Sequence, residues 1–323
     1  MKFHTPVELP ATILQLTPQS RIMTVGSCFA DHIGQRLIQC LPNKQVKVNP
    51  NGVLYNPGSI YNLLIDLQAP CFDDSGHFLF QSNDGLWHHW HYSTLFTAPS
   101  SNELTEKLQK QWAEAKILFN QLDALFITFS TDHAYYLASG KLQGTLVANC
   151  HKQPARLFVE DILDPADLFD SWNFLLHSLH RQNPSLQIIF TLSPYRYAKY
   201  GLHENALSKA RLLQLIDSLC RNHEHTHYFP AFEIITDELR DYRFYEPDML
   251  HPSEQAIDYV WERFETWAFT PELTAYAQDR QQILRDLAHH PLHPESPEAL
   301  RFKAKLEERL KLFEKKWGKA LTD

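Results

Sequence analysis

Short apolar runs alternate with amphipathic stretches along most of this 323-residue chain. Continuous apolar runs predict buried strands, and apolar residues that recur every three or four positions predict helices. The predicted strands cover residues 21–25, 45–48, 123–129, 185–191 and 226–229. The predicted helices cover residues 29–41, 59–67, 103–119, 165–181 and 204–221, and a last one follows Pro252 and ends near Trp267. Such alternation predicts an α/β fold with a mainly parallel sheet and helices on both faces.

Three regions depart from this alternation. Residues 71–93 combine polar turns with aromatic pairs, which suggests an inserted hairpin, and the stretch between the strand at 123–129 and the helix at 165–181 suggests a polar crossover. From Pro271 the composition changes, and we expect an α/β domain at 1–270 and a helical extension at 271–323. Residues 296–321 predict a charged helix with one apolar stripe, formed by Phe302, Leu306, Leu310, Phe313, Trp317 and Leu321. That stripe favours docking back on the core, and a homodimer through this helix is the alternative.

Composition narrows the class of protein. Apolar residues make up 44% of the chain and charged residues 21%, as in an ordinary globular protein. The net charge is −8 and no basic stripe is visible, so we expect no nucleic-acid partner. With no signal-peptide block and no apolar run of bilayer length, we expect a cytoplasmic protein without membrane contact. The five cysteines are widely spaced and form no Cys-x-x-Cys pair, which favours reduced, mostly buried thiols.

Ser27 lies in the turn Gly26-Ser27-Cys28-Phe29-Ala30, where the first predicted strand gives way to a helix. Unpaired N–H groups of a first helical turn and the helix dipole favour negative charge there. A serine in this position is suited to act as a nucleophile. Serine is also a common helix N-cap, so the turn alone does not distinguish the two roles.

A carboxylate and a histidine near the end of the predicted domain change this balance. Asp248 precedes His251 by three residues in a loop before the last core helix. Across such a loop Asp248 can reach the imidazole and set its tautomer, which leaves the other ring nitrogen free to take a proton from a serine. By itself the pair fits a capped loop, whereas together with Ser27 it predicts a catalytic triad.

Four motifs identify the chain as similar to a known family. They are Gly26-Ser27-Cys28-Phe29-Ala30, residues 49–57, residues 147–152 and residues 248–256. Together they resemble the GSCFA-domain family of bacterial proteins, which is similar to the SGNH, or GDSL-like, hydrolases. The resemblance spans roughly residues 20 to 268. It implies a three-layer α/β/α fold, with Ser27 as nucleophile, His251 as base and Asp248 as the acid that orients it.

The resemblance also implies an oxyanion hole, made in SGNH hydrolases by the nucleophile's N–H, a glycine after the second strand and an asparagine after the third. The amides of Ser27 and Cys28 and the backbone of Gly52 fit the first two, although Gly52 and Asn51 also suit an ordinary turn. No Gly-x-Asn follows the strand at 123–129, so Thr131 or Asn149 are the candidates for the third donor. Trp90, His91, Asn51 and His151 are further candidates to line the substrate site.

Other side chains suggest competing chemistry. Cys28 could itself be a nucleophile at a helix start, but a buried structural thiol is favoured. The histidines at 88–91 and 223–227 could ligate zinc, but they lack cysteine pairs and acidic partners at suitable spacing, so we favour solvated histidines and no metal. A dinucleotide site is disfavoured because residues 26–34 lack the Gly-x-Gly-x-x-Gly spacing. No cofactor is expected.

These observations favour a serine esterase that works through an acyl-enzyme, with a small-molecule or carbohydrate ester as substrate. Short acyl esters of carbohydrate, acetyl esters among them, follow only from the likeness to the superfamily. Two alternatives stay open. An acyltransferase would use the same residues with an alcohol in place of water, and a non-catalytic binding or assembly protein would use the scaffold without the chemistry.

Overall fold

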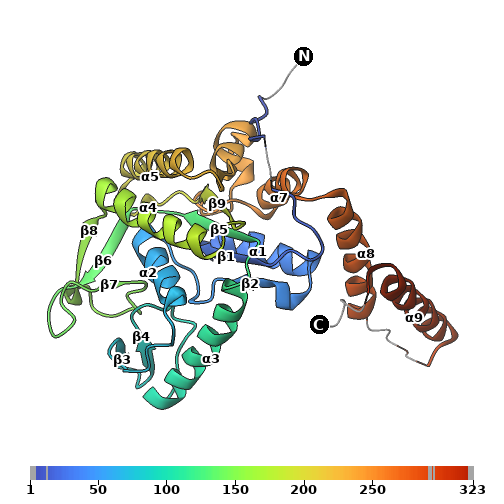
Figure 1. Cartoon of the computed structure of the whole chain (residues 1–323), viewed down its shortest axis with the longest axis horizontal. Coiled ribbons are helices and arrows are strands. Elements are labelled where there is room, and N and C mark those ends of the chain that lie inside the picture. Colours follow the sequence, from blue (N-terminus) through green and yellow to red (C-terminus); the bar gives the residue numbers. More distant parts are fainter. Residues whose placement is uncertain (1–4, 12–13, 290–292, 294, 319–323) are drawn as a thin grey trace.

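The central sheet has five parallel strands in the order β10-β9-β5-β1-β2. The computed structural model describes residues 5–11, 14–289, 293 and 295–318. The strands of this sheet are β1 (Ile22–Gly26), β2 (Val46–Val48), β5 (Ala124–Phe129), β9 (Gln187–Leu192) and β10 (Thr226–Tyr228). All five lie where the apolar runs predict them. Helices cover both faces of the sheet, so the predicted three-layer α/β/α sandwich is confirmed (Figure 1).

The side chains of each strand alternate between two hydrophobic layers. In β5, Phe126 packs with α1 (Cys28–Cys40), α7 (Glu254–Ala268) and α8 (Pro271–Ala288). Its neighbours Leu125 and Ile127 pack on the opposite face. The helices of that second face are α2 (Pro57–Gln68), α3 (Ser101–Phe119), α4 (Pro165–Gln182) and α5 (Leu202–Asn222). Because both faces of the strands are buried, their sequences are apolar runs rather than alternating patterns.

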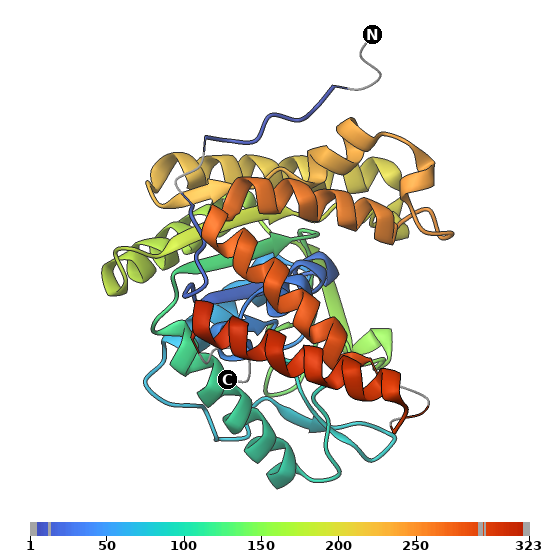
Figure 2. The same ribbon diagram turned by 90° about the vertical axis from the view of Figure 1, so that its right-hand side faces the viewer.

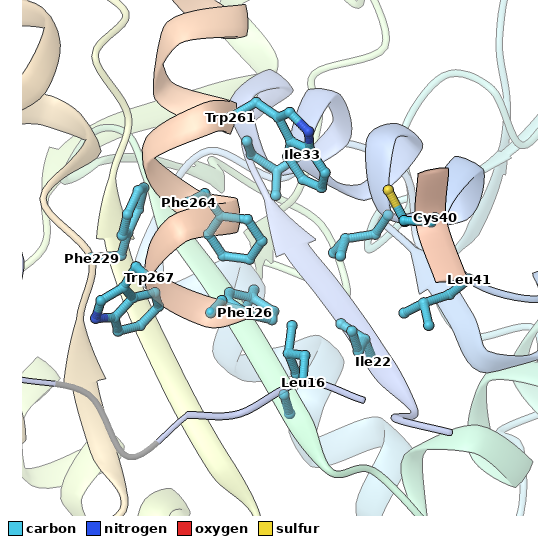
Figure 3. Packing of buried hydrophobic residues seen from close by; sticks show 14 of the residues in the cluster. Leu16, Ile22, Ile33, Cys40, Leu41, Phe126, Phe229, Trp261, Phe264 and Trp267 are labelled. Atoms are coloured by element: carbon cyan, nitrogen blue, oxygen red, sulfur yellow. The ribbon is translucent and has the colours of Figure 1, made fainter. Parts of the chain in front are cut away.

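Aromatic packing fixes α7 on the sheet. The ring of Phe264 lies 5.3 Å from that of Phe126, and the ring of Trp267 lies 5.3 Å from that of Phe229. Figure 3 shows these side chains together with Trp261 in one cluster over β5. Aromatic side chains bury large areas, so this cluster anchors the helix firmly. The loop that precedes α7 is thereby held at the carboxyl edge of the sheet.

The segment between β10 and α7 is irregular and contains only short helical pieces. It contains α6 (Ala231–Glu233), a π-helical segment (Ile234–Leu239) and a 3₁₀ turn at Tyr242–Phe244. Further 3₁₀ turns are Asn43–Gln45, Ala155–Leu157 and Ala198–Tyr200. Over the portion of the chain that is described, no helix combines the length and the apolar character needed to cross a bilayer.

The C-terminal helices pack back on the α/β core. Residues Leu273, Tyr276 and Ile283 of α8 belong to the same hydrophobic cluster as α1 and α7, so the first helix of the expected extension is part of the core. Helix α9 (Pro297–Trp317) lies antiparallel beside α8 (Figure 2) and buries Phe313 against Tyr276, with 5.4 Å between the ring centres. The predicted docking of this helix is confirmed, apart from Leu321, which lies outside the described residues. A homodimer through α9 would therefore have to use another face.

Two smaller sheets flank the carboxyl edge. The predicted hairpin is present as β3 (Leu79–Gln81) paired with β4 (Trp87–His89). The predicted polar crossover connects the parallel neighbours β5 and β9, and within it the chain forms an antiparallel sheet that was not predicted, of β6 (His133–Leu137), β7 (Leu146–Val147) and β8 (Phe158–Ile162). Strand β8 is exposed at most positions, so neither a buried run nor a regular alternation marks it in the sequence.

Candidate active site

A cavity of about 550 Å³ opens at the carboxyl edge of the central sheet. Ser27 follows β1, Thr131 follows β5 and Ser193 follows β9, and all three line it. His251 enters from the loop before α7, and Asn149 from the loop after β7. Ligands of parallel α/β sheets bind at this edge. Segments that are far apart in the sequence therefore meet here.

Ser27 is held rigidly at the start of α1. Its side chain is almost fully buried, its Oγ accepts a hydrogen bond from the Phe29 N–H at 3.3 Å, and its own N–H donates to the Thr128 carbonyl at 3.3 Å. Gly26 just before it has φ +133°, and a Cβ there would lie 2.2 Å from the Thr128 oxygen. Only glycine fits so close to the neighbouring strand. Because its oxygen is the acceptor in the bond to Phe29, the Ser27 hydroxyl keeps its proton free to donate.

Asn49, which directly follows β2, holds the same turn by hydrogen bonds. Its Oδ1 accepts from the Gly26 N–H at 2.9 Å, and its Nδ2 donates to Asp31 at 3.3 Å. The backbone N–H of Asn49 donates to Thr24 at 2.8 Å, and its φ of 41° is one that asparagine tolerates. The loop after β2 thus fixes the position of Ser27 rather than supplying a group to the cavity at this point.

Asp248 and His251 form the expected pair. The His251 Nδ1 lies 2.5 Å from Asp248 Oδ2, and the other carboxylate oxygen accepts from the N–H groups of His251 and Leu250 at 3.0 and 2.8 Å. The backbone N–H of His251, its ring and then the N–H of Leu250 lower the pKa of Asp248 to about 2. The carboxylate is therefore ionised near neutral pH and orients the imidazole. This is the relation between acid and base that nucleophilic catalysis needs.

The second nitrogen of His251 is open to the cavity. Its Nε2 has no hydrogen-bond partner among the described residues, and the side chain is 51% exposed. The ring of Tyr195 packs against it with 4.4 Å between the ring centres. Within the described chain Ser27 and His251 share no direct hydrogen bond, although both line the cavity. Active-site hydrogen bonds of this kind are often loose without substrate and tighten in the complex.

Several N–H donors surround the cavity beside Ser27. The Cys28 N–H is at the first helical position, where no intrahelical acceptor precedes it. The Oδ1 of Asn149 accepts from the His151 N–H at 2.7 Å, so its amide nitrogen faces the other way. The Oδ1 of Asn56 accepts from Ser59 at 2.8 Å, which likewise frees its Nδ2. Asn56 lines the cavity and was not expected from the sequence, although asparagine before Pro57 at a helix start is a recognisable N-cap.

Thr131 also lies at the cavity, with its hydroxyl available. Its Oγ1 accepts from the His133 N–H at 3.2 Å, which leaves the hydroxyl proton to donate. The N–H of Thr131 donates to the Tyr55 carbonyl at 3.1 Å, and the N–H of Ser130 donates to the same carbonyl at 3.0 Å. Thr131 can therefore contribute through its side chain and not through its backbone.

Five residues expected to line the site or to hold the oxyanion do not line this cavity: Gly52, Asn51, Trp90, His91 and His151. Gly52 donates its N–H to the Asn49 carbonyl at 2.7 Å, and a Cβ there would meet Ser93 at 1.9 Å, so Gly52 packs against the loop after β4 and its N–H is not available to an oxyanion. The others are placed behind the wall: Asn51 donates to the His91 carbonyl, Trp90 stacks on Phe80 at 3.6 Å, and His151 bonds to the His89 carbonyl. Trp90 supports the cavity wall, because its carbonyl accepts a hydrogen bond at 2.8 Å from the N–H of Ala148, which precedes Asn149.

Two further expectations need correction. Cys28 does not point into the core: it lines the cavity, with its Sγ 3.8 Å from the Tyr55 hydroxyl. The histidines expected in solvent are buried or partly buried, with His89 and His223 among the buried ones, and burial lowers the pKa of His223 to about 4. His223 bonds to Asn173 at 2.9 Å. In the part of the chain described here, no group of three His, Cys, Asp or Glu side chains is placed to hold a metal ion.

A buried lysine lies beneath the cavity. Lys209 of α5 is 2% exposed, and its Nζ donates to the carbonyls of Ser130 at 2.6 Å and Ser193 at 2.8 Å. Desolvation lowers its pKa to about 7, against the opposing effect of Asp132. The Nζ group joins the segments that follow β5 and β9, and it occupies both carbonyl oxygens as their hydrogen-bond donor. A carbonyl turned toward a developing oxyanion would repel it.

The family of the chain follows from its sequence over the same region. The GSCFA family profile matches residues 21–264, a span that contains Ser27, Asp248 and His251. The chain belongs to the GSCFA family. No curated protein matches this GSCFA chain. Among solved structures it is similar to an acetyl xylan esterase from the rumen bacterium Butyrivibrio proteoclasticus, at 10% identity and a TM-score of 0.33. That likeness covers 77% of this chain and 63% of the other, and it is too distant to bear on the site.

Proposed function

We propose that this GSCFA protein is a serine esterase that cleaves short acyl esters through a covalent acyl-enzyme. The observation that carries the proposal is the meeting of Ser27 and the Asp248–His251 pair at one cavity. Ser27 has a free proton to give, His251 has a free nitrogen to receive it, and Asp248 is ionised to support the resulting cation. These are the three roles that a neutral alcohol needs to become a nucleophile.

The proposed reaction has two halves. The Ser27 oxygen attacks the acyl carbon while its proton passes to His251 Nε2, and the carbonyl becomes an oxyanion. When the tetrahedral intermediate collapses, the bond to the alcohol breaks and the alcohol leaves with that proton. Water then attacks the acyl-enzyme by the same route, and releases the acid and Ser27. An alcohol in place of water would give acyl transfer with the same residues.

A panel of aryl esters tests the proposal. We expect the purified protein to release acid from 4-nitrophenyl acetate or butyrate, and to show a burst of nitrophenol if deacylation is slow. Turnover by wild type and its loss in Ser27→Ala would support the esterase. If wild type turned over no ester and formed no acyl adduct, the binding-protein alternative would be favoured.

The side-chain amide of Asn149 is expected to stabilise the oxyanion. Asn149→Ala should lower kcat by roughly 10²-fold while KM changes little, because a donor aimed at the oxyanion acts mainly in the transition state. Asn51→Ala is the matched control, since Asn51 uses its amide on the His91 carbonyl outside the cavity. Steady-state kinetics on 4-nitrophenyl acetate measure both. A loss in KM alone, or an equal loss in the two variants, would remove Asn149 from this role, and Asn56→Ala would then be the next variant to measure.

A further inference from the structure

Two backbone contacts fix where the end of the loop between β2 and α2 lies. The Leu54 N–H donates to the Gly26 carbonyl at 2.9 Å, so the loop lies against the turn that carries Ser27. The next carbonyl, that of Tyr55, accepts hydrogen bonds from the first two residues after β5, at 3.0 and 3.1 Å. Asn56 follows directly. It is thereby held where the carboxyl ends of β1 and β5 meet, beside the turn of the nucleophile.

The side-chain amide of Asn56 has a fixed orientation. Asn56 is the N-cap of α2, and its Oδ1 accepts from the Ser59 N–H at 2.8 Å. A backbone N–H can donate only to the oxygen of an amide, so this bond decides which atom of the amide is the oxygen. The Nδ2 group is thereby turned away from that N–H, and both of its hydrogens are left to donate elsewhere.

This nitrogen has no partner in the described chain, yet a ligand can reach it. Asn56 as a whole is 6% exposed, and it lines the cavity. No described group accepts from its Nδ2. The Nε2 of His133 is also unpaired but is sealed in the wall, whereas the Nδ2 of Asn56 keeps open surface. A donor on a nearly buried side chain that has no acceptor calls for a ligand.

The surroundings of Asn56 favour negative charge. Helices α1 and α2 both begin here, with Ser27 and Asn56 as their N-caps, and the amino ends of helices attract anions. Among the described residues that line the cavity there is no lysine, arginine, aspartate or glutamate. A negative charge that forms in the cavity therefore depends on N–H and O–H donors for its stabilisation.

We infer that Asn56 is a catalytic residue of the proposed esterase, and that its Nδ2 donates to the oxyanion formed when Ser27 attacks the ester carbonyl. The inference rests on the proposed function and names a donor for that same site. Asn56 takes the role that the resemblance implies for Gly52, whose N–H is used by the Asn49 carbonyl. It acts together with Asn149, which enters from the loop after β7. The amide oxygen of Asn56 caps α2, and its nitrogen serves the reaction.

Two substitutions separate the donor from the cap. Asn56→Asp and Asn56→Ser both keep an oxygen that can cap α2, because aspartate and serine cap helices about as well as asparagine, and both remove Nδ2. On 4-nitrophenyl acetate we expect Asn56→Ser to lower kcat roughly 10²-fold, and Asn56→Asp roughly 10³-fold because its charge also repels the oxyanion. KM should change by less than about threefold, since the donor acts in the transition state. The midpoint of thermal unfolding should move by less than about 3 °C.

A residue that only caps the helix would behave differently. Both variants would then keep the kcat of wild type, and this result would overturn the inference. A loss confined to KM would overturn it as well, because the amide would then bind the substrate and the transition state equally. If Asn56→Asp does not fold, Asn56→Ser decides, since it adds no charge.

The outcomes also separate this inference from the esterase proposal. An active wild type with unaffected variants would remove Asn56 alone. If wild type is labelled on Ser27 by a fluorophosphonate but hydrolyses no ester, the labelling rate replaces kcat, because attack on phosphorus also builds charge on an oxygen beside the serine. Slower labelling of Asn56→Ser would then support the inference, and equal labelling would overturn it. A wild type with neither turnover nor label would overturn both proposals.

Discussion

Ser27→Ala should lower kcat/KM for ester hydrolysis by about 10⁴- to 10⁶-fold, because without the hydroxyl no acyl-enzyme can form. The protein should keep its fold, since Ser27 contributes one hydrogen bond to the Phe29 N–H as N-cap. Loss of such a cap costs about 1 kcal/mol. Steady-state kinetics, with thermal unfolding as the measure of folding, separate the two effects. His251→Ala should cause a loss of similar size, because the triad members act as a unit.

Cys28→Ala is the matched variant for the neighbouring nucleophile. It removes the thiol that lines the cavity and keeps the backbone N–H at the first helical position. We expect its kcat/KM to stay within about threefold of wild type, because a side chain that takes no part in the reaction contributes little to the transition state. If Cys28→Ala loses activity while Ser27→Ala keeps it, the nucleophile is the thiol, and the assignment of Ser27 is wrong.

Gly26→Ala should destabilise the protein by roughly 3–5 kcal/mol, the combined cost of overpacking and of a strained φ. Its new Cβ would lie 2.2 Å from the carbonyl oxygen and 2.9 Å from the carbonyl carbon of Thr128, and both are backbone atoms that cannot move aside. The clash would push β1 and β5 apart at the point where Ser27 is positioned. Urea unfolding of wild type and variant measures the change in free energy.

Gly140→Ala is the control for the backbone strain alone. Gly140 has φ +88°, and a Cβ there would have no atom within 4 Å. The variant should lower the free energy of unfolding by only about 1–2 kcal/mol, because a residue with a side chain is strained in a left-handed conformation. If Gly26→Ala were no worse than Gly140→Ala, the close contact between β1 and β5 would not be what the turn requires.

The central sheet could be predicted because its strands are buried on both faces. Residues 124–129 are all buried, so the sequence shows an uninterrupted apolar run. Strand β8 has only Phe158 partly buried, and nothing in its composition separates it from a loop. The same pattern predicts that Ser27 and Thr131 lie at one edge of the sheet, because the carboxyl ends of parallel strands lie together, and both residues do line the cavity there.

The direction of loop side chains could not be predicted from the pattern. Gly52 follows β2 as expected, but its N–H returns to Asn49, and that bond depends on φ angles that the sequence does not reveal. His133 and Tyr195 reach the cavity only through tertiary packing. Lys209 did leave a signal, because it lies three residues before Leu212 and seven before Ile216, on the buried face of α5. A lysine on an apolar stripe needs buried acceptors, and here they are the carbonyls of Ser130 and Ser193.

Covalent labelling with a fluorophosphonate, followed by peptide mapping, tests the central assignment most directly. The probe reacts with a serine that a nearby base has activated, and it forms a stable bond to the serine oxygen. We predict one adduct on Ser27 in the wild-type protein, none in Ser27→Ala, and much slower labelling in His251→Ala. Labelling that persists in Ser27→Ala, or a wild-type protein that takes no label, would contradict the account.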